Sequence, residues 1–359
     1  MKTKGRIVAI MLALLLVAGL LAGCTEDAPP PPVDTPPPAA GDATTPAPAV
    51  PTTPDTDSHA IIENVTDLVV GFSIKNMHNP YLIAMNQTME EQAAHFGYEL
   101  MTLNAGGDAA QQQMDVEDLI AMGADVIVMD AQDPVATIAI SEYIASHNIP
   151  LFLLNASVDP ACIFVTIVQS NNTGLGSAVG EWVADQIDGP VRIGLLAGNP
   201  GNMTGFARRT GFIQGLTERQ LERFNSTNFL VQTMGWGNWS AELGMEAAED
   251  MLVAAPDINV IFAENDAMAM GVITAVRNAG REGEVLVVGI DGMRDALELI
   301  EDGVYGATGV NSPIELVRMA MQIMVDYMTG ENRNIPSQIH TTPGMVYAGN
   351  VATRWDTAF

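Results

Sequence analysis

Aspartate and asparagine side chains follow the apolar runs of this chain, at the points where strands would end and the next helices would begin. Asp130 follows VIVM, Asn155 follows PLFLL, Asn265 follows IFAE, Asp291 follows VVGI and Asn311 follows ATGV. Carboxylates accept hydrogen bonds, and amides both donate and accept them, which is the pairing that vicinal hydroxyl groups require. Any one of these residues is better explained as a turn or helix-cap residue, but their repetition predicts a shared ligand site.

Aromatic and cationic side chains in polar loops add to this set. The stretch GWGNWS places Trp236 and Trp239 after an apolar run, and HNPYL places Tyr81 after the first such run. A tryptophan in a Gly/Asn loop is more often a recognition surface than a core residue, and we expect Trp239 to stack on a ligand. In GFARRTGF, Arg208 offers a planar donor pair, and one of Arg208 and Arg209 is expected on a solvated helix face. Two aromatic faces among Asn, Asp and Arg predict a carbohydrate site.

No catalytic constellation accompanies these residues. GNPGNMTG follows an apolar run but lacks the Lys-Ser/Thr of a phosphate loop and the spacing of a dinucleotide motif. No G-x-S-x-G nucleophile motif occurs, and the five histidines are dispersed without the spacing of metal ligands. Cys162 has no base near it in the sequence and is expected to be a buried thiol. The sequence therefore predicts a protein that is not an enzyme and uses no cofactor or metal.

Short apolar runs alternate with helix-like segments along most of the chain. LVVGFSI, YELMTLN, DVIVMD and IPLFLLN are separated by helical stretches, and the rhythm resumes with PVRIGLLAG, FLVQTM, INVIFAEN, VLVVGID and YGATGVN. This spacing predicts parallel sheets with helices on both faces, and about ten strands exceed one comfortable sheet. The predicted fold class is α/β, with two doubly wound parallel-sheet domains. Ligands of such sheets bind outside the carboxyl ends of the strands, where the Asn and Asp residues stand.

The charge balance of the chain excludes one class of partner. Its 359 residues carry 15 basic and 43 acidic side chains, for a formal net charge of −28. Nucleic-acid binding requires a basic footprint, so no nucleic-acid partner is expected, and the acidity is interpreted as a solvated surface. Lys75 is the only lysine beyond the first few residues.

The first residues have the pattern of an export signal followed by a spacer. Lys2, Lys4 and Arg6 precede an apolar stretch at 7–21, which is too short for a membrane span and ends in LLAGC. This ending resembles the bacterial lipobox, which implies a signal peptide at 1–23 and a lipidated Cys24 on the extracytoplasmic face of the cell membrane. Residues 24–60 are rich in Pro, Thr and Ala, and they predict a disordered tether.

Beyond residue 67 the motifs resemble those of a known family. HNPYL, DLIAMGADVIVMDAQDP, LAGNPGN followed by ARRTGF, AENDAMAMG, VVGIDG and ATGVNSP occur in the order and spacing of type I periplasmic sugar-binding proteins. The resemblance is to the galactose/glucose- and ribose-binding members above all. It implies two lobes, 61–170 with 311–333 and 171–310 with 334–359, joined by a three-segment hinge with crossings near Ser170, Val310 and Arg333.

The same resemblance implies a mode of action and a set of ligand contacts. A sugar would draw the two lobes together, and the closed protein, which we expect to be a monomer, would deliver it to the permease subunits of an ABC importer. The implied and predicted ligand-binding residues are Asn79, Tyr81, Asp130, Asn155, Asn202, Arg208, Trp239, Asn265, Asp291 and Asn311. In AENDAMAMG, Asn265 is then the ligand group, and Asp266 is the helix cap beside it.

Departures from the family pattern leave the ligand open. Ala156 stands where both kinds of relative carry a basic residue, Asn202 and Thr204 stand where the glucose/galactose type has His and Asp, and Phe206 stands about where the ribose type has Arg. No calcium loop is visible near 185–189. A pentose, a hexose, a polyol and an inositol all fit, and the alternative ligands are a nucleoside or a furanosyl signal molecule. A sensor that presents its bound form to a membrane receptor would have the same pocket.

Overall fold

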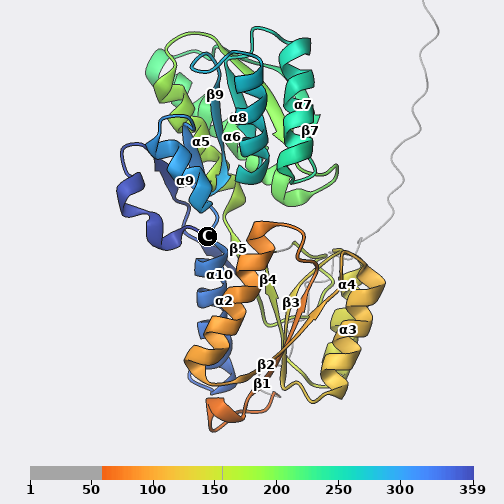
Figure 1. Cartoon of the computed structure of the whole chain (residues 1–359). Coiled ribbons are helices and arrows are strands. Elements are labelled where there is room, and N and C mark those ends of the chain that lie inside the picture. Colours follow the sequence, from red (N-terminus) through yellow and green to blue (C-terminus); the bar gives the residue numbers. More distant parts are fainter. Residues whose placement is uncertain (1–58, 156) are drawn as a thin grey trace, which may run out of the picture. The chain divides into compact units, whose positions relative to one another are not determined.

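Within residues 59–155 and 157–359, which the computed structural model describes, the chain forms two six-stranded sheets (Figure 1). The predicted signal peptide at 1–23, Cys24, nearly all of the predicted tether at 24–60, and Ala156 lie outside the described residues. Both sheets carry helices on their two faces, as the alternation of apolar runs and helical segments predicts.

The first sheet has the strand order β11-β5-β4-β3-β1-β2, and all of its neighbouring strands run parallel. Its strands are β1 (Val69–Ile74), β2 (Glu99–Asn104), β3 (Val126–Asp130), β4 (Leu151–Leu154), β5 (Thr166–Ser170) and β11 (Gln338–Thr341). The helices that pack on it are α2 (Pro80–Phe96), α3 (Ala109–Ala121), α4 (Ala136–Ser146) and α10 (Pro313–Met328). A short 3-10 helix, η1 (Val65–Asp67), precedes β1. We call this sheet and its helices the first lobe.

The second sheet has the order β12-β10-β9-β8-β6-β7, and only the pair β10 and β12 is antiparallel among these described strands. Its strands are β6 (Val191–Ala197), β7 (Phe229–Trp236), β8 (Val260–Ala263), β9 (Leu286–Asp291), β10 (Ala307–Val310) and β12 (Met345–Tyr347). Its helices are α5 (Asn172–Gln186), α6 (Met203–Phe224), α7 (Ala241–Ala254), α8 (Asp266–Asn278) and α9 (Arg294–Glu301). The 3-10 turns η2 (Val351–Thr353) and η3 (Trp355–Thr357) follow. These elements form the second lobe.

The central strands are apolar on both faces because helices cover both faces. In β3, Val126 and Val128 face the core formed with α2 and α10, while Ile127 and Met129 face the core formed with α3 and α4. In the second lobe, Phe212 of α6 stacks on Phe262 of β8 with ring centroids 4.4 Å apart. The two-sided cores explain why the strand segments appear in the sequence as continuous apolar runs rather than as alternating ones.

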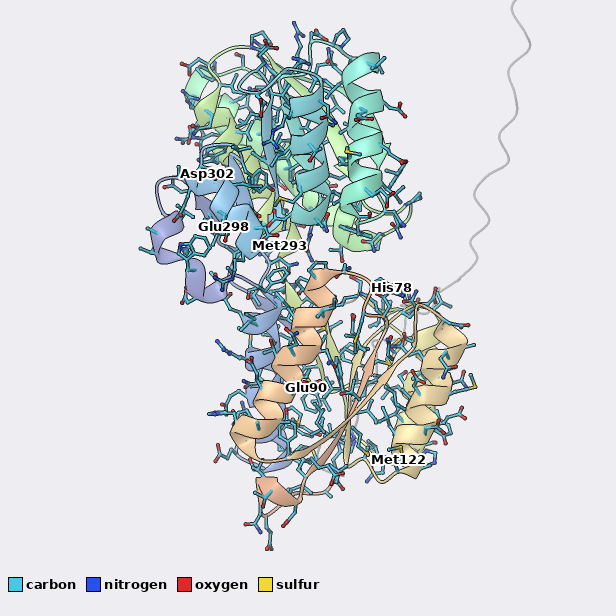
Figure 2. All side chains as sticks on the ribbon, viewed as in Figure 1. His78, Glu90, Met122, Met293, Glu298 and Asp302 are labelled. Atoms are coloured by element: carbon cyan, nitrogen blue, oxygen red, sulfur yellow. The ribbon has the colours of Figure 1, made fainter. Side chains whose placement is uncertain are left out.

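Exposed acidic side chains occur on the helix surfaces. Glu90 on α2, and Glu298 and Asp302 at the end of α9, are exposed side chains of this kind (Figure 2). Among the described residues no helix combines the length and the apolar character that crossing a membrane requires.

The chain passes between the two sheets at three places. It leaves β5 at Ser170 for α5, leaves β10 at Val310 for α10, and leaves β11 at Thr341 for β12. The prediction of a third crossing near Arg333, with 334–359 wholly in the second lobe, is wrong. β11 pairs with β5 in the first sheet, so the crossing lies after Thr341. The strand QIHT at the sheet edge is largely solvent-exposed and lacks the apolar run that marks the other strands.

The predicted tether extends two residues too far. His59 is buried, its Nδ1 lies 2.6 Å from the Tyr327 hydroxyl, and the Arg333 guanidinium donates to the carbonyl oxygens of His59 and Ala60. These contacts attach His59 and Ala60 to the first lobe at the end of α10.

Helices α5 and α6 pack backbone to backbone through glycines. A Cβ atom added at Gly176 would overlap the carbonyl oxygen of Arg208, and one added at Gly180 would overlap that of Phe212. Gly211 and Gly215 on α6 meet the backbone of α5 in the same way. The spacing of four residues on each helix places both glycines on one face. This close contact fixes the backbone position of Arg208 relative to α5.

We expect Gly180→Ala to lower the free energy of unfolding by about 1–3 kcal/mol, because the added methyl group forces α5 and α6 apart. Urea unfolding followed by circular dichroism measures the change. Gly189→Ala is the matched control, since a Cβ there meets nothing within 4 Å. Equal loss of stability in both variants would contradict the packing argument.

Candidate functional site

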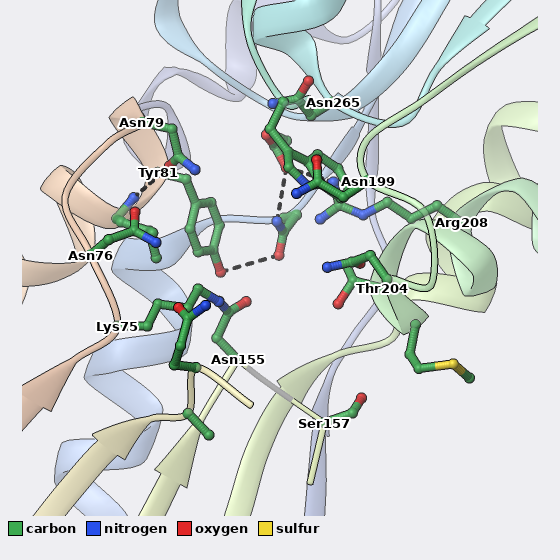
Figure 3. A pocket seen from close by; sticks show the side chains of 18 of the residues that line it. Lys75, Asn76, Asn79, Tyr81, Asn155, Ser157, Asn199, Thr204, Arg208 and Asn265 are labelled. Atoms are coloured by element: carbon green, nitrogen blue, oxygen red, sulfur yellow. Dashed lines mark hydrogen bonds and ion pairs between the residues drawn. The ribbon is translucent and has the colours of Figure 1, made fainter. Parts of the chain in front are cut away.

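The carboxyl ends of the strands in both sheets border a pocket of about 470 Å³ (Figure 3). This volume lies within the range of small-molecule sites, roughly 300–1,000 Å³. Of the residues predicted to bind a ligand, those that line it are Asn79, Tyr81, Asn155, Asn202, Arg208, Trp239, Asn265, Asp291 and Asn311. Asp130 is the predicted residue that does not line it. The structure therefore brings together side chains that are distant in the sequence.

Three asparagines of the pocket are helix caps, and this role orients their amides. The Oδ1 atoms of Asn79, Asn202 and Asn265 each accept a bond of 3.0 Å from the backbone N–H three residues later, at the starts of α2, α6 and α8. A capping oxygen must point at the helix N-terminus. The NH₂ group of the same amide therefore points away from the helix, and the three asparagines can serve as hydrogen-bond donors in the pocket.

The assignment of Asp266 as the cap of α8 is wrong, because Asn265 is the cap. Asp266 is fully buried, and its Oδ2 accepts from the backbone N–H groups of Gly292 and Met293 at 2.8 and 2.9 Å. Its Oδ1 accepts from the hydroxyls of Tyr305 and Thr308, both at 2.7 Å. Burial raises the pKa of Asp266, which these hydrogen bonds oppose. The carboxylate thus fixes the turn after β9, which carries the pocket residue Met293.

A buried ion pair forms one wall of the pocket. Arg208 Nη1 lies 3.0 Å from Asp291 Oδ1 and also donates to the Glu264 carbonyl oxygen at 2.6 Å, while Nε donates to Asn172 Oδ1 at 2.9 Å. Arg208 and Asp291 are 3% and 4% exposed. Among the described residues, Arg208 Nη2 and Asp291 Oδ2 have no hydrogen-bond partner. The pair therefore retains one donor and one acceptor for a ligand.

The network continues from Asp291 to an aromatic residue of the first lobe. Asn311 Nδ2 donates to Asp291 Oδ1 at 2.9 Å, and Asn311 Oδ1 accepts from the hydroxyls of Ser170 and Tyr81. The Tyr81–Asn311 bond, 3.3 Å long, is drawn in Figure 3. Burial and the nearby Asp291 carboxylate raise the pKa of the Tyr81 hydroxyl, so it remains a donor. Ser170 and Asn311 lie where the chain crosses between the sheets. The hydrogen bonds of Asn311 therefore connect pocket residues to the crossing segments.

Asp130 lies behind the pocket wall and positions two residues that do line it. Its Oδ1 accepts from Lys75 Nζ at 3.2 Å and from Asn155 Nδ2 at 3.4 Å, and the residue is 0% exposed. Burial raises the pKa of Asp130, and the Lys75 ammonium opposes this shift. Lys75, at the carboxyl end of β1, lines the pocket and was not among the predicted site residues. Lys75 is the only lysine beyond the first few residues, and this isolation is the sequence feature that could have identified it as a site residue.

The two tryptophans of GWGNWS differ in location. Trp239 lines the pocket in a left-handed backbone conformation (φ 61°), and its ring occupies the space that a side chain at Gly198 would need. Trp236, at the end of β7, is 42% exposed and is not a pocket residue. Arg209 is not on a solvated face, because its Nη1 pairs with the buried Glu264 carboxylate at 2.7 Å. Neither of the adjacent arginines is therefore a free surface cation.

Sequence reasoning missed the loop residues of the pocket. Asn76, Gln132, Asp133, Ser157 and Asn199 line it from loops and turns that carry no periodic pattern, and Thr204 lines it from the first turn of α6. Within the described part of the chain, no group of three or more His, Cys, Asp or Glu residues is arranged to hold a metal ion. Asp185 and Asp188, in the segment 185–189 whose sequence shows no calcium loop, pair with Arg219 and Arg223.

Residues 70–332 match the family model described as a periplasmic binding protein domain. The chain belongs to this family. The match confirms the resemblance seen in the motifs, and the parallel sheets confirm the predicted fold class.

Known relatives cover most of the chain. The ribose import binding protein RbsB of Bacillus subtilis (strain 168) is 27% identical over 268 residues, which are 75% of this chain and 84% of the relative. The D-allose-binding periplasmic protein of Escherichia coli (strain K12) is 25% identical over 262 residues, 70% of this chain and 82% of the relative. These relatives are binding proteins, which agrees with the prediction that this protein is not an enzyme.

A solved structure supports the same relationship. A periplasmic solute binding protein of an ABC transporter from Actinobacillus succinogenes 130z, with bound D-allose, aligns with a TM-score of 0.73 and 28% identity. The alignment covers 80% of this chain and 99% of that one.

Asp291→Asn tests the buried carboxylate in the absence of a ligand. Burial and the Asp266 carboxylate raise the pKa of Asp291 from 3.8 to about 7, against the opposing effect of Arg208. The folded protein therefore takes up a proton more readily than the unfolded chain, and its stability should fall as pH rises through this range. We compare the free energy of unfolding of the wild type with that of Asp291→Asn. We expect the difference, wild type minus variant, to decrease by roughly 2 kcal/mol between about pH 5 and about pH 8.

Urea unfolding of both proteins at the two pH values measures this change. If the relative stability of the wild type instead increased with pH, the Arg208 guanidinium would outweigh burial, and Asp291 would be an ordinary ionised carboxylate.

Proposed function

We propose that this periplasmic binding protein captures a monosaccharide or related polyol in the pocket and delivers it to an ABC importer. The observation that carries the proposal is the composition of the pocket wall. Amide, carboxylate and guanidinium groups with free hydrogen-bonding capacity surround two aromatic residues, Tyr81 and Trp239. Sugars present hydroxyls around an apolar ring face, and this combination of groups complements both parts.

The charges of the pocket favour an uncharged ligand. The Arg208 guanidinium is paired with Asp291, and the Lys75 ammonium is paired with Asp130. Because each of these cations already has its counterion, neither is left to pair with an anionic ligand, and the further lining carboxylate, Asp133, is exposed and accepts from the backbone N–H groups of Val135 and Ala136. A ligand that lacks a matching hydroxyl would leave one of these buried groups unpaired, which is the physical basis of selectivity among sugars.

The relatives support aldoses as the first ligands to examine. The names of two relatives specify ribose and D-allose, and the Actinobacillus structure holds D-allose. We propose Asn79, Asn155, Asn202, Asn265, Arg208, Asp291 and Asn311 as hydrogen-bonding contacts, with Trp239 and Tyr81 packing on the ring. Asp130 acts through Lys75 and Asn155 rather than by contact.

Delivery to an importer would use the anchor and tether. The lipobox-like LLAGC would place a lipid on Cys24, and the proline-rich segment that follows would let the two lobes reach a membrane permease. Closure of the lobes around the ligand would mark the loaded protein for its partner.

A thermal-shift screen of the purified protein tests the ligand class. Probes are D-ribose, D-allose, D-galactose, myo-inositol, glycerol and adenosine. A compound that binds only the folded protein raises the melting temperature by mass action. We expect a shift with an aldose, and Trp239→Ala should weaken the binding of that sugar by about tenfold to a hundredfold, measured by titration calorimetry.

Trp236→Ala is the control for this substitution, because Trp236 lies three residues away on the same motif but outside the pocket. Its affinity for the sugar should equal that of the wild type. A shift with adenosine and none with any sugar or polyol would retain the pocket but assign a nucleoside as its ligand. Equal weakening by both tryptophan substitutions would contradict the assignment of Trp239.

Cys24→Ala tests the anchor. We expect the wild-type protein to sediment with membranes and the variant to remain in the released fraction, because the lipid on Cys24 is the anchor that we propose. Metabolic labelling with a fatty acid provides the chemical readout, and label retained by Cys24→Ala would overturn the assignment.

A further inference from the structure

Phe359 contacts a pocket residue of the other lobe. Its ring lies edge-to-face against the ring of Tyr81, with centroids 5.7 Å apart and planes at 87°. Phe359 also packs against the core of the first lobe that α2 and α10 share. Tyr81 in turn lines the pocket and donates to Asn311. The aromatic contact therefore supports the Tyr81 ring in addition to the bond that its hydroxyl makes.

The backbone around Phe359 belongs to the second lobe. The Arg294 N–H, at the start of α9, donates to the Phe359 carbonyl oxygen at 2.9 Å. Ala358 is 5% exposed in the core that α7, α8 and α9 share. Met293, the residue before Arg294, lines the pocket. The main chain at Phe359 thus bonds to the segment that carries Met293, while the Phe359 ring contacts Tyr81 on the other wall of the pocket. Figure 1 marks this end of the chain next to α10.

We propose that Phe359 is a positioning residue for ligand binding, which holds the Tyr81 ring in place and braces it against the turn between β9 and α9. Edge-to-face aromatic pairs favour one orientation of the rings. A side chain that is ordered before binding loses less conformational entropy when the ligand arrives. Removing the Phe359 ring should therefore weaken binding even though Phe359 is not a pocket residue.

The first test needs no ligand, so its result is independent of the proposed function. NMR spectra of protein with ¹³C-labelled tyrosine are compared for wild type, Phe359→Leu and Trp355→Leu, with Tyr81→Phe identifying the Tyr81 signal. Trp355 is the matched control, because it lies in the same segment and packs against the core of the second lobe. We expect the Tyr81 ring signals to shift and broaden in Phe359→Leu and to stay in place in Trp355→Leu. Unchanged signals in Phe359→Leu would overturn the proposal.

The second test asks whether the effect on binding passes through Tyr81. Calorimetry with the aldose found in the screen is expected to show about tenfold weaker binding for Phe359→Leu, recovery in Phe359→Tyr, and no loss in Trp355→Leu. In a Tyr81→Ala background, Phe359→Leu should cause no further loss, because residues that act through one another are not additive. An equal loss in both backgrounds would overturn the positioning role.

The two tests separate two kinds of failure. If the wild-type protein binds no aldose, the proposed function fails, while the NMR comparison still decides whether Phe359 orders Tyr81. If an aldose binds and Phe359→Leu binds it as tightly as the wild type, the positioning role alone fails.

Discussion

Burial of one ion pair, Arg208 with Asp291, sets the requirements that the rest of the site meets. Charges removed from water destabilise a protein unless their hydrogen-bonding groups are satisfied. Arg208 meets this requirement through the Glu264 carbonyl and Asn172, and Asp291 through Asn311. Since Asn311 also accepts from Ser170 and Tyr81, one network joins the pocket wall to the segments that cross between the sheets. The same bonds therefore hold both the pocket wall and the residues at two of the crossings.

The position of Arg208 depends on packing that contains no charge. Glycines on α5 and α6 let the two backbones touch, and Gly176 meets the backbone of Arg208 itself. Any larger side chain there would displace the guanidinium from Asp291. The contact between two helices thus determines whether the ion pair can form, and the ion pair determines which hydrogen-bonding atoms face the pocket.

Helix capping orients three of the amide donors in the pocket. A cap residue satisfies a local requirement of its helix, and it does so with one side of its amide only. Asn79, Asn202 and Asn265 each use the oxygen for the helix, which leaves the NH₂ group for a ligand. Asn265, which the sequence assigns as a ligand group beside a cap at Asp266, is itself the cap of α8 and also lines the pocket. The periplasmic binding protein fold places such helix starts around one pocket, so a local structural need supplies a binding function.

The sequence by itself determined the fold class and indicated a set of polar residues as candidates for the pocket, because strand periodicity and strand ends are local patterns that the chain shows without folding. It did not determine which of these residues face the pocket. Asp130 ends a strand like the others, but Lys75 covers it. Asp266 is a buried acceptor for Thr308 of β10 and for the turns after β9 and before β10. β11 carries no apolar run, and Phe359 contacts Tyr81 although the two are distant in the sequence. These features arise from contacts between residues far apart in the sequence, and only the tertiary structure, which brings the partners together, decides them.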